Sequence, residues 1–277
     1  MSRSVLVIML GILGVPTCVA VADALKPGDS LNYATTTSWS DWPAHDPSRI
    51  MPKSDAEWAK VPVGDIFKRS TSGTFVVKVD RLDADGSAHA SAVFSDNKPN
   101  KPNKRVTGLP DQLVIDVNVM PDGQIVPKVD FAMVRAAGFD QSTNNPNFPP
   151  GYIPKTPAEW SNTLAFMASR KLLLFNAVAL GAGKKKSFKE GDAWRIVVPD
   201  QNNLIVNFLC RGTQQFQGRD VAELDITSTR TTEDGARPVS GTALYDLQNH
   251  LLVKLHAVGD IDIGYGVRNQ TLDIVLQ

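Results

Sequence analysis

The sequence contains little cysteine: its 277 residues include only Cys18 and Cys210. Two cysteines cannot build a disulfide framework, so a folded domain has to be stabilised by a hydrophobic core. Cys210 ends an apolar run, Leu204–Cys210, in which a buried and unreactive thiol is expected.

Net charge is also absent, because 29 basic side chains balance 29 acidic ones. A nucleic-acid partner would require a basic surface, so none is expected. The four histidines are His45, His89, His250 and His256, and no two have the spacing of a zinc site. The chain also lacks a G-x-S-x-G motif and a glycine-rich phosphate loop, so we expect no metal and no cofactor.

Long apolar runs are lacking too, apart from one at the N-terminus. Arg3 precedes the run Val5–Val15, and Ala20 and Ala22 then give an A-x-A cleavage site. This pattern predicts a signal peptide over residues 1–22, too short to remain as a membrane span. Lipidation at Cys18 is the alternative, although Thr17 fits poorly before a lipidated cysteine.

Cleavage after Ala22 leaves residues 23–277, with 28 basic and 29 acidic side chains and a charge of −1. No later stretch is both long and uncharged enough to cross a bilayer, since Arg170 and Lys171 interrupt the longest one. We therefore expect an exported protein, periplasmic or extracellular, with no transmembrane segment in the mature chain.

What the chain does have is alternating apolar and polar residues, with Asp-Gly turns between the runs. Phe75–Asp80 leads through Asp85-Gly86 into His89–Phe94, and Leu113–Val119 leads through Asp122-Gly123 into Ile125–Val129. Each is a predicted β-hairpin. Further strands are predicted at Trp194–Val198, Leu204–Phe216, Val221–Ser228, Gly241–Leu247, Leu251–Val258, Asp260–Ile263 and Thr271–Leu276. About ten strands joined by short turns indicate an antiparallel sheet.

One long apolar helix, Pro157–Leu180, interrupts the strands. It begins with a capping box at Thr156 and Glu159 and ends at Gly181. Most of its faces are apolar, and Asn162, Ser169 and Asn176 form one narrow polar strip.

The expected fold is mainly β (α+β): a curved antiparallel sheet or half-barrel packed around this central helix. It forms one β-rich domain over residues 23–277. Similar turns at Gly28-Asp29 and Gly191-Asp192 open the two β-rich parts. Residues 25–130 and 189–277 are therefore candidate similar halves, joined by a strap and helix over residues 144–183.

The first functional hypothesis is a non-enzymatic cell-envelope protein that binds a lipid or another hydrophobic ligand beside the helix. The candidate ligand-binding residues are Trp160, Leu164, Phe166, Leu173 and Phe175. The competing interpretation is a core helix held tightly by the sheet.

Two other classes of function stay open. Trp39, Trp42 and Trp58 lie near one insertion and could form a glycan-binding or adhesion surface. A hydrolase would need His45 or His256 to meet an aspartate and a serine in a cleft.

The export signal, the strand pattern and the helical insertions together resemble the Lol-type lipoprotein carriers and the mycobacterial lipid-carrier lipoproteins. In these families an unclosed β-barrel curls around helices and shelters acyl chains, so the resemblance implies lipid binding. The repeated Gly-Asp and Asp-Gly turns are also similar to uncharacterised bacterial secreted proteins, from which no activity follows.

Overall fold

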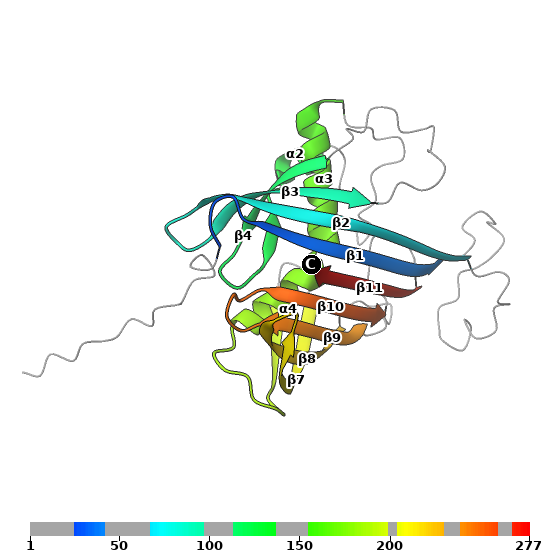
Figure 1. The fold of residues 1–277 in the computed structure, drawn as a ribbon. Coiled ribbons are helices and arrows are strands. Elements are labelled where there is room, and N and C mark those ends of the chain that lie inside the picture. Colours follow the sequence, from blue (N-terminus) through cyan, green and yellow to red (C-terminus); the bar gives the residue numbers. More distant parts are fainter. Residues whose placement is uncertain are drawn as a thin grey trace, which may run out of the picture.

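In the described part of the computed structural model, the chain forms one antiparallel sheet of eleven strands and three helices (Figure 1). The structure describes residues 25–41, 67–96, 113–136, 155–198, 204–229, 239–259 and 268–277. The strands are β1 (Ser30–Asp41), β2 (Phe67–Leu82), β3 (Ala88–Asp96), β4 (Leu113–Val119), β5 (Ile125–Pro127), β6 (Ala193–Val198), β7 (Leu204–Phe216), β8 (Arg219–Thr229), β9 (Val239–Asp246), β10 (Leu252–Gly259) and β11 (Arg268–Leu276). The helices are α2 (Phe131–Ala136), α3 (Pro157–Lys171) and α4 (Leu173–Gly183).

The sheet consists of two meanders joined at its centre. Its order is β5-β4-β3-β2-β1-β11-β10-β9-β8-β7-β6, so β1 pairs with β11 although the two are far apart in the chain. Tyr33 of β1 lies between Leu276 of β11 and Phe75 of β2. The sheet is open, with β5 and β6 as its two edge strands.

The two faces of the sheet differ as strand alternation predicts. Residues such as Tyr33, Val77 and Ile274 point to the inner face and are buried, whereas their neighbours in sequence point outward. In Figure 1 the helices lie behind the strands, on this inner face. The hydrophobic core therefore lies between one sheet face and the helices.

The sheet curls so that strands far apart in its order meet at one end. A Cβ added to Gly123, in the β4–β5 turn, would lie 2.4 Å from the carbonyl oxygen of His250 in the β9–β10 turn. The positive φ of Gly123 (84°) already favours glycine there. Asp246 shapes the second turn, since it accepts hydrogen bonds from the backbone N–H groups of Gln248 and Asn249. The expected curvature is therefore present in an open sheet.

The prediction of one long helix over Pro157–Leu180 is wrong. The helix is broken at Leu172 (φ −86°, ψ 0°), and the two parts meet at 58°. No proline or glycine marks the break, and the hydroxyl of Ser169 donates to the carbonyl oxygen of Phe166 within α3. The bend lets α3 pack on β4 and β5 while α4 packs on β6, β7, β9 and β10, because a straight helix cannot follow both parts of a curled sheet.

Within the described residues, no single helix is long and apolar enough to cross a membrane. In this described part of the chain, the bent pair α3 and α4 passes that test, on length and composition alone.

Most predicted strands are confirmed, and β4 and β7 have the predicted bounds. The short helix α2 was not predicted. The signal peptide, the strap before α3, the strand predicted at Asp260–Ile263, and Trp42, Trp58 and His45 lie outside the described residues.

Candidate functional site

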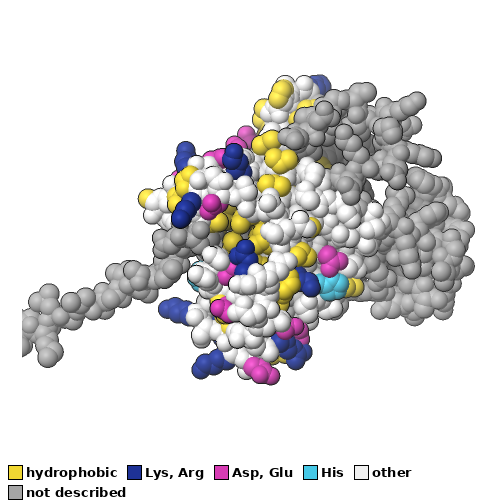
Figure 2. Space-filling model, in the orientation of Figure 1, with side chains coloured by type: hydrophobic (Ala, Val, Ile, Leu, Met, Phe, Trp, Pro, Cys, Tyr) yellow, Lys and Arg dark blue, Asp and Glu magenta, His cyan; other side chains and the backbone are white. Residues whose placement is uncertain are grey.

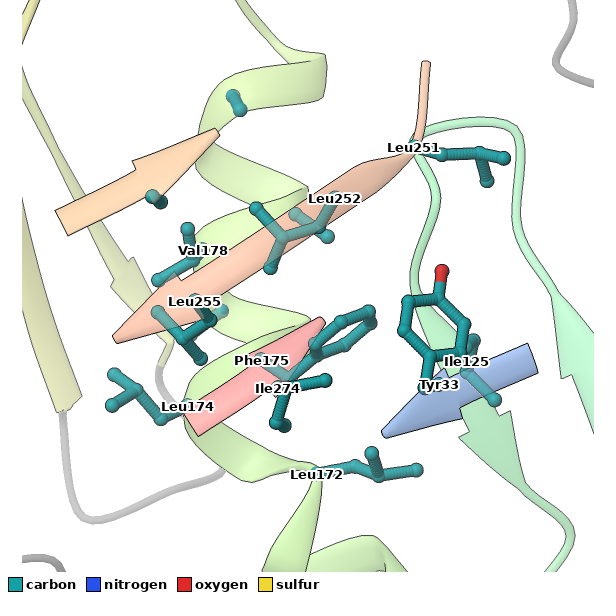
Figure 3. Packing of buried hydrophobic residues seen from close by; sticks show 14 of the residues in the cluster. Tyr33, Ile125, Leu172, Leu174, Phe175, Val178, Leu251, Leu252, Leu255 and Ile274 are labelled. Carbon is teal, nitrogen blue, oxygen red and sulfur yellow. The ribbon is translucent and has the colours of Figure 1, made fainter. Parts of the chain in front are cut away.

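The inner face at the α4 end of the sheet is filled by side chains. Phe175 is completely buried, and its ring meets the rings of Tyr33 and Phe75 edge-on at 5.5 and 6.3 Å between centroids. Figure 3 shows Phe175 among Val178, Leu255 and Ile274, from α4, β10 and β11. Phe175 therefore lies in the core of the protein.

The end of α4 is held just as closely. The ring of Phe208 lies against Gly181, where an added Cβ would come within 2.3 Å of it. Trp194 stacks on Phe208 with centroids 4.9 Å apart, and its indole N–H donates to the carbonyl oxygen of Gly181 at 3.0 Å. These contacts fix α4 to β6 and β7.

Along α3 the packing is less complete. Trp160 and Leu164 are half-buried, as is Leu173 just after the bend. Phe166 is buried in a separate small cluster with Val134 of α2. The structure therefore does not bring the five candidate residues together in one place.

Apolar side chains also reach the surface around α3. Met167 is 42% exposed, and Phe131 of α2 is 46% exposed. Figure 2 shows hydrophobic side chains at the top of the view, where α3 begins in Figure 1. The accessible apolar surface of the bent helix pair is thus mainly on α3.

The polar strip on the helices faces the β5 edge of the sheet. Asn176 accepts a hydrogen bond from the backbone N–H of Ile125 and donates to its carbonyl oxygen, both at 2.8 Å. Asn162 makes the same pair of bonds with Asp130, at 2.7 and 3.0 Å. The two amides therefore satisfy backbone groups as a neighbouring strand would. The sequence showed this strip, but its partners lie 32 and 51 residues away.

The inner face changes character along β1 and β2. Beyond the large side chains of Tyr33 and Phe75, the next inward positions are Thr35 and Gly73, which lie opposite each other, followed by Thr37. These three residues are half-buried. Figure 1 shows β1 and β2 extending well past the helices at this end. On β1 these inward positions carry hydroxyl groups, and Ile274 and Leu272 of β11 lie beside Thr35 and Thr37.

Tyr33 has an unusual polar group for a core residue. It is only 1% exposed, and its hydroxyl has no hydrogen-bond partner in the described structure. Burial raises its pKa, with a small opposing effect from Arg219. In Figure 3 the hydroxyl points towards Leu251, which is the closed end of the sheet. It therefore faces away from Thr35 and Thr37.

His256 does meet a carboxylate, as the hydrolase hypothesis requires. Its Nδ1 lies 2.7 Å from Oδ1 of Asp273 across the β10–β11 pair, and both side chains are about 40% exposed. In the described part of the chain no serine or threonine hydroxyl is hydrogen-bonded to His256, so the pair has the character of a cross-strand contact.

The described residues contain no group of three or more His, Cys, Asp and Glu side chains placed to hold a metal ion. Trp39 belongs to β1, but Trp42 and Trp58 fall outside the described chain, so the glycan-binding hypothesis stays a prediction.

Comparisons with known proteins give one weak similarity. No family model matches the chain, and no curated protein matches it. Among solved structures, a DUF1329 family protein from Desulfovibrio piger aligns with 92% of this chain and 87% of its own, at 12% identity and a TM-score of 0.21.

Proposed function

We propose that the protein is an exported, non-enzymatic binding protein for an amphiphilic lipid or a similar hydrophobic ligand. The ligand would lie beside α3, between that helix and the inner face of β1 and β2 beyond Tyr33. Its apolar part would contact Leu164 and Leu173, and its polar head would meet the hydroxyls of Thr35 and Thr37.

The observation that carries this proposal is the change along the inner face. On the α4 side Phe175 and its aromatic neighbours fill the space, which argues against a ligand there. At the other end of β1 and β2 the inward positions Thr35, Gly73 and Thr37 are small and half-buried. α3, which packs on β4 and β5, keeps Leu164 half-buried, as is Leu173 after the bend. A mostly apolar wall with a few polar groups is typical of ligand sites. The resemblance to lipid carriers supports the same choice.

The test compares two tryptophan substitutions on adjacent residues of β1. Thr37 points inward and Thr36 points outward, where its hydroxyl lies 3.4 Å from that of Ser72. Thr37→Trp is expected to fill the site and to weaken binding of a fluorescent fatty acid at least about tenfold, because its bulk replaces the ligand. Thr36→Trp should bind like the wild type.

Native mass spectrometry of the purified protein should also find a co-purified lipid, and less of it in Thr37→Trp. Equal binding by both folded variants, or no binding by the wild type, would contradict the proposal. Thermal unfolding of each variant shows that the comparison is made between folded proteins.

A further inference from the structure

The edge strand β6 has backbone groups that no described strand uses. Cys210 donates its backbone N–H to the carbonyl oxygen of Asp192, and Trp194 then lies opposite Phe208 and Ile196 opposite Val206. Because hydrogen-bonded and non-bonded pairs alternate, the even-numbered residues of β6 bond to β7. The N–H and C=O groups of Ala193, Arg195 and Val197 therefore point away from the sheet.

The opposite edge is closed. β5 has three residues and ends at Pro127, which has no N–H to donate. The outward N–H and C=O groups of Ile125 are bonded to Asn176. Native proteins commonly block sheet edges in this way, whereas β6 is six residues long, has no proline, and carries one charge, Arg195. Among the described residues, β6 is therefore the one sheet edge with backbone groups left for pairing.

From this asymmetry we infer that β6 pairs with β6 of a second copy of the chain, antiparallel and about a twofold axis. One available edge per molecule makes the assembly a closed dimer and not a fibre. The mature chain expected after cleavage has a formal net charge of only −1, so two copies do not repel each other strongly.

The side chains of β6 select one register. Placing Arg195 opposite Arg195 of the second copy would set like charges against each other, which is destabilising. A shift that places Arg195 opposite Val197 avoids this, and Ile196 then faces Ile196 on the axis. The two pairs of Arg195 and Val197 would exchange about four backbone hydrogen bonds.

The exposed side chain of Val197 on the outer face of the sheet agrees with this register. Val197 is 47% exposed, and Ile205 beside it on β7 is half-buried. In the dimer the aliphatic part of Arg195 from the second copy would cover Val197. The pairing thus removes an exposed apolar side chain and the free backbone groups together.

The experiment uses the purified full chain and sedimentation equilibrium. The wild type is expected to show a monomer–dimer equilibrium and no larger species. Val197→Pro removes an outward N–H without touching the β6–β7 bonds, so the dimer dissociation constant should rise at least about tenfold. Val197→Thr keeps the N–H and the β-branched shape, and should dimerise nearly as the wild type does.

Cross-linking provides a second measurement in case Val197→Pro fails to fold. Residues that face each other at a non-hydrogen-bonded position are about 4.5 Å apart at Cα, within disulfide range. Ile196→Cys should therefore form a disulfide-linked dimer under mild oxidation. Ile205→Cys, one strand away from the edge, should not. Both variants also carry Cys18→Ser, and Cys210 is buried, so the native cysteines do not interfere.

A wild type that is monomeric at all concentrations would overturn the inference. The inference would also fail if Val197→Pro left the dimer unchanged and Ile196→Cys formed no disulfide-linked dimer. It would fail as well if β6 paired only with another protein.

Discussion

At the residue scale, the most informative side chain is Tyr33, a core residue whose hydroxyl has no hydrogen-bond partner among the described residues. Its ring stacks on Phe75 with centroids 4.5 Å apart, so the ring itself packs well. An unpaired buried hydroxyl costs about 1–3 kcal/mol. The aromatic packing of Tyr33 therefore offsets an unfavourable hydroxyl.

Tyr33→Phe keeps the ring and removes the hydroxyl, so we expect the free energy of unfolding to stay equal or to rise by about 1 kcal/mol. Tyr245→Phe is the matched control, because the hydroxyl of Tyr245 lies 3.5 Å from the carbonyl oxygen of Asp122. Its loss should cost up to about 1 kcal/mol. Urea unfolding of both variants measures the difference. A clear loss of stability in Tyr33→Phe would show that the hydroxyl has a partner, such as a buried water.

At the element scale, the bent pair α3 and α4 has two structural roles: filling the core and protecting a sheet edge. α4 fills the inner face near β7 and β10, while both helices supply an asparagine to the β5 edge. The break at Leu172 allows both, since each helix follows its own part of the sheet.

Asn176→Ala would leave the N–H and C=O of Ile125 without their partner. We expect a loss of about 1–3 kcal/mol of unfolding free energy, because unpaired buried backbone groups are costly. Ser169→Ala is the control from the same polar strip, since its hydroxyl bonds only within its own helix, and it should change stability by less than about 0.5 kcal/mol. Hydrogen exchange at Ile125 should accelerate in Asn176→Ala alone. Equal stability of the two variants would show that the amide does not protect the edge.

The elements themselves were predictable from local patterns. Alternation and Asp-Gly turns place β2 to β5 and β7 to β10, because strands and tight turns depend on neighbouring residues. The break at Leu172 was not predictable, since it depends on strands far away in the chain. The same holds for Asn162 and Asn176, which the sequence shows as polar but whose partners only the fold reveals.

At the scale of the whole molecule, the candidate site is the least predictable part. Phe175 was expected to line a ligand site and lies in the core, because the curl of the sheet brings Tyr33 and Phe75 to it. Thr35 and Thr37 carried no signal in the sequence, since threonine is common in strands.

The predicted export concerns the whole chain and can be tested directly. Protein recovered from the periplasm or the medium of an expressing bacterium should begin at Asp23, as measured by intact mass. Ala22→Arg should block cleavage and retain the precursor, because the cleavage site needs a small residue. A product that begins at Cys18 and carries lipid would establish the lipoprotein alternative, and an uncleaved cytoplasmic protein would exclude export.

The position of β11 between β1 and β10 has a consequence for the order of folding. Tyr33 pairs with Leu276, so the middle of the sheet closes a loop of more than two hundred residues, whereas each meander needs only short loops. Long loops cost more entropy and form slowly, so each meander is able to assemble early. The two meanders join only when β11 pairs with β1. In a nascent or translocating chain that still lacks Arg268–Leu276, β1 and β10 would be unpaired edge strands, accessible to chaperones and proteases. The central pairing of the sheet is therefore complete only after Arg268–Leu276 has been synthesised.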